Sequence, residues 1–186
     1  MFRSSPGRTA PLRAAITAVA VLITGGCMPA DDDSKGVNAP LPRMTREAAL
    51  KWAKDYTAYM GGIAGVDIDR STEVPRYAGC VGENDEVAED GRFIFRYRVF
   101  TELPPTQHTA VVRALKNQLE KDGYEIADYR EYQDARLSAS LLAIHKEHGY
   151  TVSANTNRPN KTSPDSMSFS ANVPCMLPPD VEQQQF

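Results

Sequence analysis

The stretch RFIFRYRVF, residues 92–100, alternates large apolar side chains with arginines and is the clearest strand pattern in the chain. Successive side chains of a strand point to opposite faces of a sheet, so this segment has one apolar and one basic side. The apolar side consists of Phe93, Phe95, Tyr97 and Val99, and the basic side of Arg92, Arg96 and Arg98. We expect the apolar side to face a core and the arginines to pair with acidic neighbours across the sheet; contact with an anionic ligand is the alternative.

Four later segments are also predicted to be strands: the first as a return strand after the second helix, and the other three because apolar residues recur in them at every second position. They are Tyr124–Glu131, Arg136–Lys146, Tyr150–Thr156 and Ser166–Cys175. In several of them serine, threonine and asparagine stand between the apolar residues. This pattern is typical of a sheet with one buried and one solvated face.

Two amphipathic helices are predicted, one before and one after the arginine-rich strand. Thr45 is a good N-cap for the first helix, and Gly61-Gly62 is expected to end it. Pro104-Pro105 opens the second helix, and Gly123 follows it as a terminating glycine. A strand, helix and strand this close in sequence are compatible with a crossover between parallel strands.

The resulting order of elements predicts an α+β fold. We expect a two-layer sandwich with about two helices on one face of a mainly antiparallel, four- to five-stranded sheet, and the other face exposed to water. Val66–Gly91 has no regular pattern and contains a run of acidic residues, so it is expected to be a solvated loop.

The N-terminal part has the layout of a secretory signal. Arg3, Arg8 and Arg13 precede an uncharged run from residue 14 to residue 24, which is shorter than the roughly 20 residues that span a bilayer. Thr24-Gly25-Gly26-Cys27 resembles a bacterial lipobox, with Thr24 where lipoboxes usually carry an aliphatic residue. That resemblance implies cleavage before Cys27 and acyl chains attached to it. An ordinary secretory signal with an incidental cysteine is the alternative.

The predicted lipid anchor defines the expected organisation and location of the chain. Two acyl chains hold a protein stably, so the domain would stay at the outer, extracytoplasmic face of the cell membrane. We expect a signal peptide over residues 1–26, a flexible tether over 27–44, a single domain over 45–178 and a frayed tail over 179–186.

Two cysteines, Cys80 and Cys175, remain beside the predicted lipid attachment site. Outside the cytoplasm a remaining pair of cysteines usually forms a disulfide, and we expect one here. Two free, buried thiols are the alternative.

The charge of the chain limits its partners. Three of the 21 basic residues and none of the 24 acidic residues lie in the predicted signal, so the processed chain carries a net charge of −6. This balance argues against nucleic acid and against anionic lipid head groups as partners.

Three further segments are similar to a family of small actinomycete lipoproteins. These segments are LEKDGYEI at residues 119–126, HGYTVS at residues 148–153 and Val173-Pro174-Cys175. Together with the lipobox, they extend the resemblance over most of the chain after residue 26. The resemblance implies a location in the cell envelope and brings no established activity with it.

No arrangement of residues in the sequence predicts a catalytic centre, a cofactor site or a metal site. Two of the three histidines, His145 and His148, lie three residues apart, but a zinc site needs a third protein ligand, and the spacing of His108 does not provide one. Neither a G-x-S-x-G elbow nor a glycine-rich phosphate loop is present.

We therefore expect a non-catalytic domain that binds an envelope protein or a small ligand. The candidate contact surface is the hydroxyl-rich sheet face formed by Ser138, Ser140, Thr151, Ser153, Ser166, Ser168 and Ser170. The alternative is a small envelope hydrolase or metal-dependent enzyme that uses His145 or His148, which would place a carboxylate within hydrogen-bond reach of the imidazole.

Overall fold

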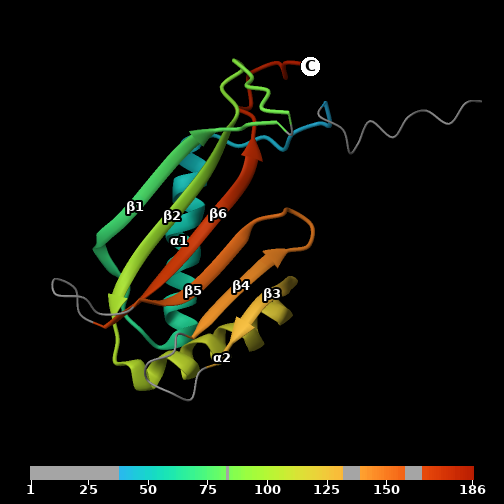
Figure 1. The fold of residues 1–186 in the computed structure, drawn as a ribbon. Coiled ribbons are helices and arrows are strands. Elements are labelled where there is room, and N and C mark those ends of the chain that lie inside the picture. The colour runs from blue at the N-terminus through green and yellow to red at the C-terminus, as the bar shows by residue number, and fades with distance from the viewer. Residues whose placement is uncertain (1–37, 83, 132–138, 158–164) are drawn as a thin grey trace, which may run out of the picture. The chain divides into compact units, whose positions relative to one another are not determined.

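One antiparallel sheet and two helices make up the domain in the computed structural model, which describes residues 38–186 except 83, 132–138 and 158–164. The elements are α1 (Arg46–Ala64), β1 (Asp69–Gly79), β2 (Phe93–Glu102), α2 (Pro105–Lys121), β3 (Tyr124–Arg130), β4 (Ser140–His145), β5 (Thr151–Asn157) and β6 (Ser166–Met176). In this described part the sheet order is β1-β2-β6-β5-β4-β3, and both helices lie on one side of the sheet (Figure 1). The predicted α+β sandwich is confirmed, but its sheet has six strands instead of four to five.

The additional strand is β1, in the segment Val66–Gly91 that was expected to be a solvated loop. It pairs antiparallel with β2, with Arg76 opposite Arg96. Most of its residues are exposed because it is an edge strand, and Pro75 lies within it. An exposed edge strand does not need alternating apolar residues, and proline is tolerated there, so the usual strand pattern is absent.

Helix α1 begins as predicted but ends later. The Thr45 hydroxyl accepts a hydrogen bond from the backbone N–H of Ala48 at 3.0 Å, as expected of an N-cap. The helix continues through Gly61 and ends at Gly65, which has a φ of 66°. Gly61 is buried, and a Cβ built on it would lie 2.7 Å from a side-chain carbon of Ile68. This glycine therefore permits close packing inside the helix instead of ending it.

Helix α2 has the predicted limits and joins two distant strands. It starts after Pro104, and Gly123 follows its last turn with a φ of 87°. Four antiparallel pairings separate β2 from β3, so these two strands run in the same direction. They are not neighbours, because β6, β5 and β4 lie between them. Helix α2 consequently covers the β3–β5 half of the sheet, while α1 covers β2 and β6.

The hydrophobic core lies between the helices and one face of the sheet. The apolar side of β2 is buried, as predicted. It packs with side chains from both helices, including Ala53 and Met60 of α1 and Leu115 and Leu119 of α2. Full burial of one such large apolar side chain contributes about 1.5–3 kcal/mol to stability. Because the helices cover only one face, the side chains of the opposite face remain outside this core.

The two ends of the described chain lie side by side. The backbone N–H of Leu177 donates to the carbonyl of Pro42 at 2.9 Å, and Met44 donates back to Leu177 at 3.0 Å. The Arg43 guanidinium donates to the carbonyls of three C-terminal residues, Pro178, Pro179 and Val181. Part of the expected tail, residues 179–186, therefore hydrogen-bonds to residues 38–44, the final part of the expected tether.

The predicted signal, Cys27 and the rest of the tether lie outside the described residues. Among the residues that are described, neither helix has the length and apolar character needed to cross a membrane.

Candidate ligand-binding face

The face of the sheet opposite the helices carries a row of hydroxyl and amide side chains. On this face Ser170 of β6 lies opposite Ser153 of β5 and opposite Arg98 of β2. The described members of the predicted contact surface all lie here: Ser140, Thr151, Ser153, Ser166, Ser168 and Ser170. Ser138 lies outside the described residues. Because both helices pack on the other side, no described helix covers this row (Figure 1).

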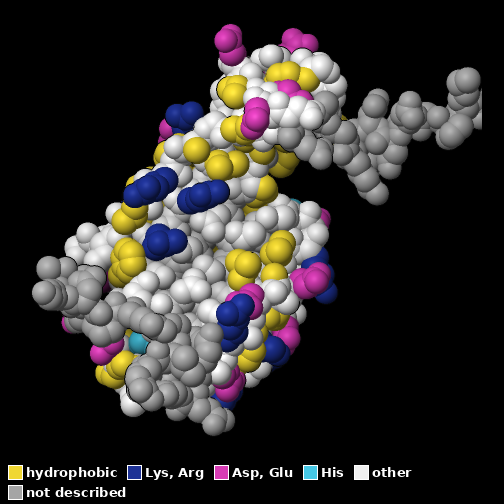
Figure 2. Space-filling view, in the orientation of Figure 1, with side chains coloured by type: hydrophobic (Ala, Val, Ile, Leu, Met, Phe, Trp, Pro, Cys, Tyr) yellow, Lys and Arg dark blue, Asp and Glu magenta, His cyan; other side chains and the backbone are white. Residues whose placement is uncertain are grey.

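Three arginines lie on this face at one edge of the sheet, on the neighbouring strands β1 and β2. Arg76 of β1 lies directly opposite Arg96 of β2, and Arg98 follows two residues later on the same side. All three side chains are exposed. Figure 2 views this face and shows basic side chains gathered over β1 and β2, while acidic and basic side chains lie together over β3 and β4. We refer to Arg76, Arg96 and Arg98 as the arginine group.

The predicted pairing of these arginines with acidic neighbours across the sheet is wrong for the described residues. The cross-strand neighbours of Arg96 are Arg76 and Asn172, and those of Arg98 are Val74 and Ser170. None of the arginine group forms an ion pair with another described residue. Both Arg96 and Arg98 are exposed, and contact with an anionic ligand, the alternative stated from the sequence, stays a prediction.

The nearest acidic residues along the same strands are directed elsewhere. Glu73 of β1 lies three residues before Arg76, but its carboxylate binds the Lys54 ammonium of α1 at 2.6 Å. Glu102 lies at the far end of β2, opposite Ser166. The positive charges of the arginine group therefore have no compensating carboxylate on their own strands.

The arginine group borders a shallow hollow of ≈ 530 Å³. The polar side chains that line it are Arg76, Arg96, Arg98, Ser153, Ser170 and Asn172. Ser170 lies between Arg98 and Ser153 and is only 6% exposed, and its hydroxyl has no hydrogen-bond partner among the described residues. The Asn172 amide donates to the Thr151 hydroxyl at 3.1 Å. The hollow thus presents three guanidinium groups above a floor with a free hydroxyl.

Within the described residues, His145 and His148 have no carboxylate at hydrogen-bond distance, which the enzyme hypothesis requires. The rings of His145 and His148 are stacked, with centroids 4.7 Å apart, at the turn between β4 and β5. Among the described residues, His148 faces the Glu147 carboxylate at 4.0 Å from Nε2, which is beyond hydrogen-bond reach, and the side chains of His148 and Glu147 are well exposed. The Nδ1 atom of His145 accepts two long hydrogen bonds, at 3.3 Å, from the backbone of its own turn.

His108 lies apart from this pair and has a structural role. It is buried on α2, with Nδ1 3.0 Å from the Thr156 hydroxyl and Nε2 2.9 Å from the Leu103 carbonyl. Both ring nitrogens are therefore occupied. Within the described ranges no group of three or more histidine, cysteine, aspartate or glutamate side chains is arranged to hold a metal ion.

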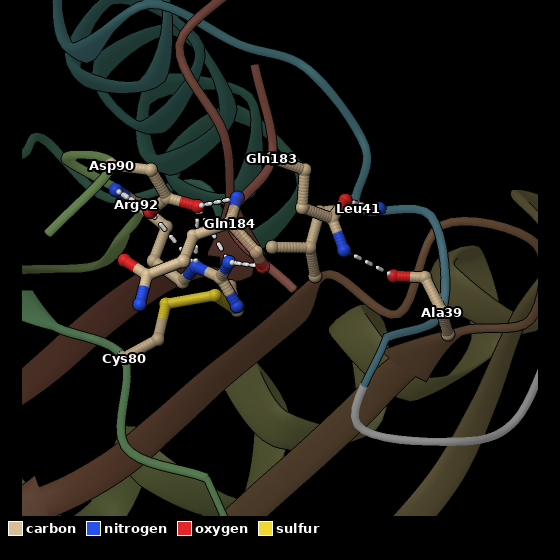
Figure 3. Close-up of a disulfide and its surroundings, with 8 residues drawn as sticks. Ala39, Leu41, Cys80, Asp90, Arg92, Gln183 and Gln184 are labelled. Atoms are coloured by element: carbon tan, nitrogen blue, oxygen red, sulfur yellow. Dashed lines mark hydrogen bonds and ion pairs between the residues drawn. A yellow bond between two sulfur atoms is a disulfide. The ribbon is translucent and has the colours of Figure 1, made fainter. Parts of the chain in front are cut away.

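Arg92, the first of the three arginines at residues 92–100, is buried near one end of the domain instead of facing solvent. Its guanidinium binds the Asp90 carboxylate and donates to the Gln184 carbonyl at 2.8 Å (Figure 3). The two side chains are only 7% and 4% exposed. Hydrogen bonds from Arg92 hold the pKa of Asp90 well below its usual range.

The same end of the domain contains the cysteine pair. The structure places Cys80 and Cys175 at the distance of a disulfide, with their Cα atoms 5.8 Å apart, which agrees with the expected bridge. Cys80 follows β1 and lies next to the Asp90–Arg92 pair (Figure 3). The bridge joins the loop after β1 to the end of β6.

Comparison with known proteins adds no functional information. The chain matches no protein-family model, no curated protein and no solved structure.

Arg76 is the member of the arginine group that the sequence analysis missed. It lies between Pro75 and Gly79 in a segment without alternation, so its strand could not be recognised. The only signal available was indirect: a basic residue on a segment that returns antiparallel to the arginine-rich strand would face Arg96 or Arg98.

Proposed function

We propose that this chain is a membrane-anchored, extracytoplasmic binding protein whose ligand contacts the open face of the sheet. The observation that carries the proposal is a polar sheet face that neither described helix covers, together with three exposed arginines on it that have no acidic partner among the described residues. Buried side chains on the helix side account for stability, whereas the arginine group and the free Ser170 hydroxyl have no such role. Polar groups without structural partners are the ones available to a ligand.

The proposed location rests on the N-terminal sequence and is supported by the cysteine pair. Arginines before a short apolar run, followed by Gly25-Gly26-Cys27, are the basis for a lipid anchor on Cys27. A disulfide persists outside the cytoplasm, and the separation of Cys80 and Cys175 suits one. With acyl chains as anchor, the folded domain needs no membrane-binding surface and its open face stays free for a ligand.

Mass spectrometry of the protein from a bacterial host with lipoprotein processing tests the anchor. We expect the mature chain to begin at Cys27 and to carry the mass of its acyl chains. The Cys27→Ala variant should be released or remain unprocessed. A mature chain without lipid mass would refute the anchor.

Site-specific photo-crosslinking in the same host tests the binding face. A photoreactive residue at Ser153, in the hollow, should give a discrete adduct, whereas the same residue at Glu120, exposed on α2, should give none. Replacement of Ser170 by Trp in the Ser153 variant should remove the adduct by filling the hollow. Equal labelling from both positions, or labelling from neither, would contradict the proposed face.

A further inference from the structure

We propose that the hollow beside the arginine group binds a ligand that carries two neighbouring phosphate groups, such as a diphosphate ester. This inference rests on the proposed function and names the chemistry of its ligand.

The first argument is the spacing of the charges. Residues directly opposite on neighbouring antiparallel strands have Cβ atoms about 5 Å apart, and diagonal neighbours about 7–8 Å. Arg76 and Arg96 are a direct pair, and Arg98 is diagonal to Arg76. Three guanidinium groups therefore extend from an area about as wide as two adjacent phosphate groups.

The second argument is that this arrangement disfavours the unliganded protein. Like charges directly opposite one another on a sheet are destabilising. The chain has more acidic than basic residues, yet its described acidic residues do not neutralise this group. An anionic ligand would supply the missing compensation.

The third argument concerns the number of negative charges that the hollow can match. One carboxylate carries a single charge and would leave about two of the three arginine charges uncompensated. A phosphate monoester carries about −1.5 to −2 near pH 7, so two linked phosphates suit three arginines better. The planar guanidinium forms paired hydrogen bonds with phosphate oxygens, and the Ser170 hydroxyl offers one more donor.

The fourth argument is the shape and border of the hollow. Its ≈ 530 Å³ falls within the range of small-molecule sites and is too small for an extended polymer. Val74 and Phe100 also line it, and they provide apolar contact for the organic part of the ligand. Of the two aromatic residues in its lining, Tyr97 is fully buried, which leaves Phe100 alone to stack on a base and argues against an RNA or DNA strand.

Calorimetric titration of the purified chain with inorganic pyrophosphate at low salt tests the proposal. We expect saturable binding that weakens about tenfold or more in Arg96→Gln and in Arg98→Gln, and by a smaller factor in Ser170→Ala. Arg113→Gln is the control for net charge, because it removes one positive charge from an exposed arginine of α2 that pairs with Glu131 and does not line the hollow. Its affinity should equal that of the unaltered chain. Far-ultraviolet circular dichroism verifies that each variant is folded.

Several outcomes would overturn the proposal. Absence of binding at millimolar pyrophosphate would do so, as would equal weakening in Arg113→Gln, since that result indicates unspecific attraction between charges. Equally tight binding of acetate would exclude phosphate as the recognised group. If pyrophosphate fails but the Ser153 adduct persists, the face binds a ligand of another class and only this inference falls.

A second arm identifies the source of the phosphate groups. Vesicles of phosphatidylcholine with and without phosphatidic acid are sedimented with the non-lipidated Cys27→Ser chain. Binding of pyrophosphate without co-sedimentation assigns a soluble phosphate ester. Co-sedimentation that requires phosphatidic acid and is lost in Arg96→Gln assigns a lipid headgroup.

Discussion

Two regions of the molecule use arginine in opposite ways. At the end of the domain that holds the cysteine pair, Arg92 is buried and binds Asp90, and Arg43 donates to three carbonyls of the C-terminal segment. On the open face of the sheet, Arg96 and Arg98 are exposed and have no acidic partner among the described residues. Arg92, Arg96 and Arg98 come from one nine-residue stretch, so residue type and sequence position alone do not determine the role.

The difference shows how the surroundings separate a structural arginine from one available to a ligand. Arg92 has an aspartate two residues earlier and a chain end that supplies a carbonyl, so its charge is neutralised inside the protein. Arg96 meets another arginine across the strand pair. Removal of a buried, paired charge leaves its partner uncompensated, whereas removal of an exposed and unpaired charge does not.

The largest expected effect concerns the disulfide between Cys80 and Cys175. Cys80 and Cys175 are 95 residues apart, and a cross-link that closes a loop of this length contributes about 4–5 kcal/mol in the chain-entropy model. We expect the Cys80→Ala/Cys175→Ala double variant to lose about this much free energy of unfolding in urea. A curve that coincides with that of the unaltered chain would show that the two thiols do not form the bridge.

The second effect concerns Arg92 itself. Arg92→Leu leaves the Asp90 carboxylate buried without its partner, so we expect a loss of about 3 kcal/mol in the free energy of unfolding. Arg96→Leu is the control from the same strand and should change stability by less than about 0.5 kcal/mol. If both variants lose the same free energy of unfolding, the buried Arg92 contributes no more to stability than the exposed Arg96.

The third effect is the loss of stability at low pH that arises from the Asp90–Arg92 pair. The pKa of Asp90 is lower in the folded chain than its unfolded value of about 3.9, chiefly because of hydrogen bonds from Arg92. The stability that this carboxylate provides is therefore present above pH 4 and is lost as the pH falls through the folded pKa. The advantage of the unaltered chain over Asp90→Asn should shrink by about 1–2 kcal/mol between pH 6 and pH 3. Urea unfolding at each pH measures it; a constant difference would contradict the pairing.

The comparison also explains what could be predicted from the sequence. The alternation in residues 92–100 correctly predicts a buried apolar side, because burial imposes a period of two on that side. The same alternation places Arg92, Arg96 and Arg98 together, but it contains no information on what lies opposite each of them. Those neighbours come from β1, β6 and the C-terminal segment, and cross-strand register depends on tertiary structure.

The prediction that the first helix ends at Gly61-Gly62 was wrong for a related reason. Glycine favours the end of a helix, but it is also the residue that permits another segment to pack closely against a helix. Ile68, which approaches Gly61, belongs to a segment that lies beyond the helix in the chain. Only the tertiary contact decides between the two uses.

The smallest expected effect isolates the repulsion within the arginine group. Arg76 and Arg96 face each other without a described carboxylate between them, so Arg96→Gln should raise the free energy of unfolding by about 0.2–0.5 kcal/mol at low salt. The gain should disappear when Arg76 is already glutamine, and it should diminish at 1 M salt, where the screening length is about 3 Å. Urea unfolding of the two single variants and the double variant measures this coupling. A loss of more than about 1 kcal/mol in Arg96→Gln would instead mean that Arg96 stabilises the fold. A small gain together with weaker pyrophosphate binding would show that the arginine group lowers the stability of the free protein and serves a ligand.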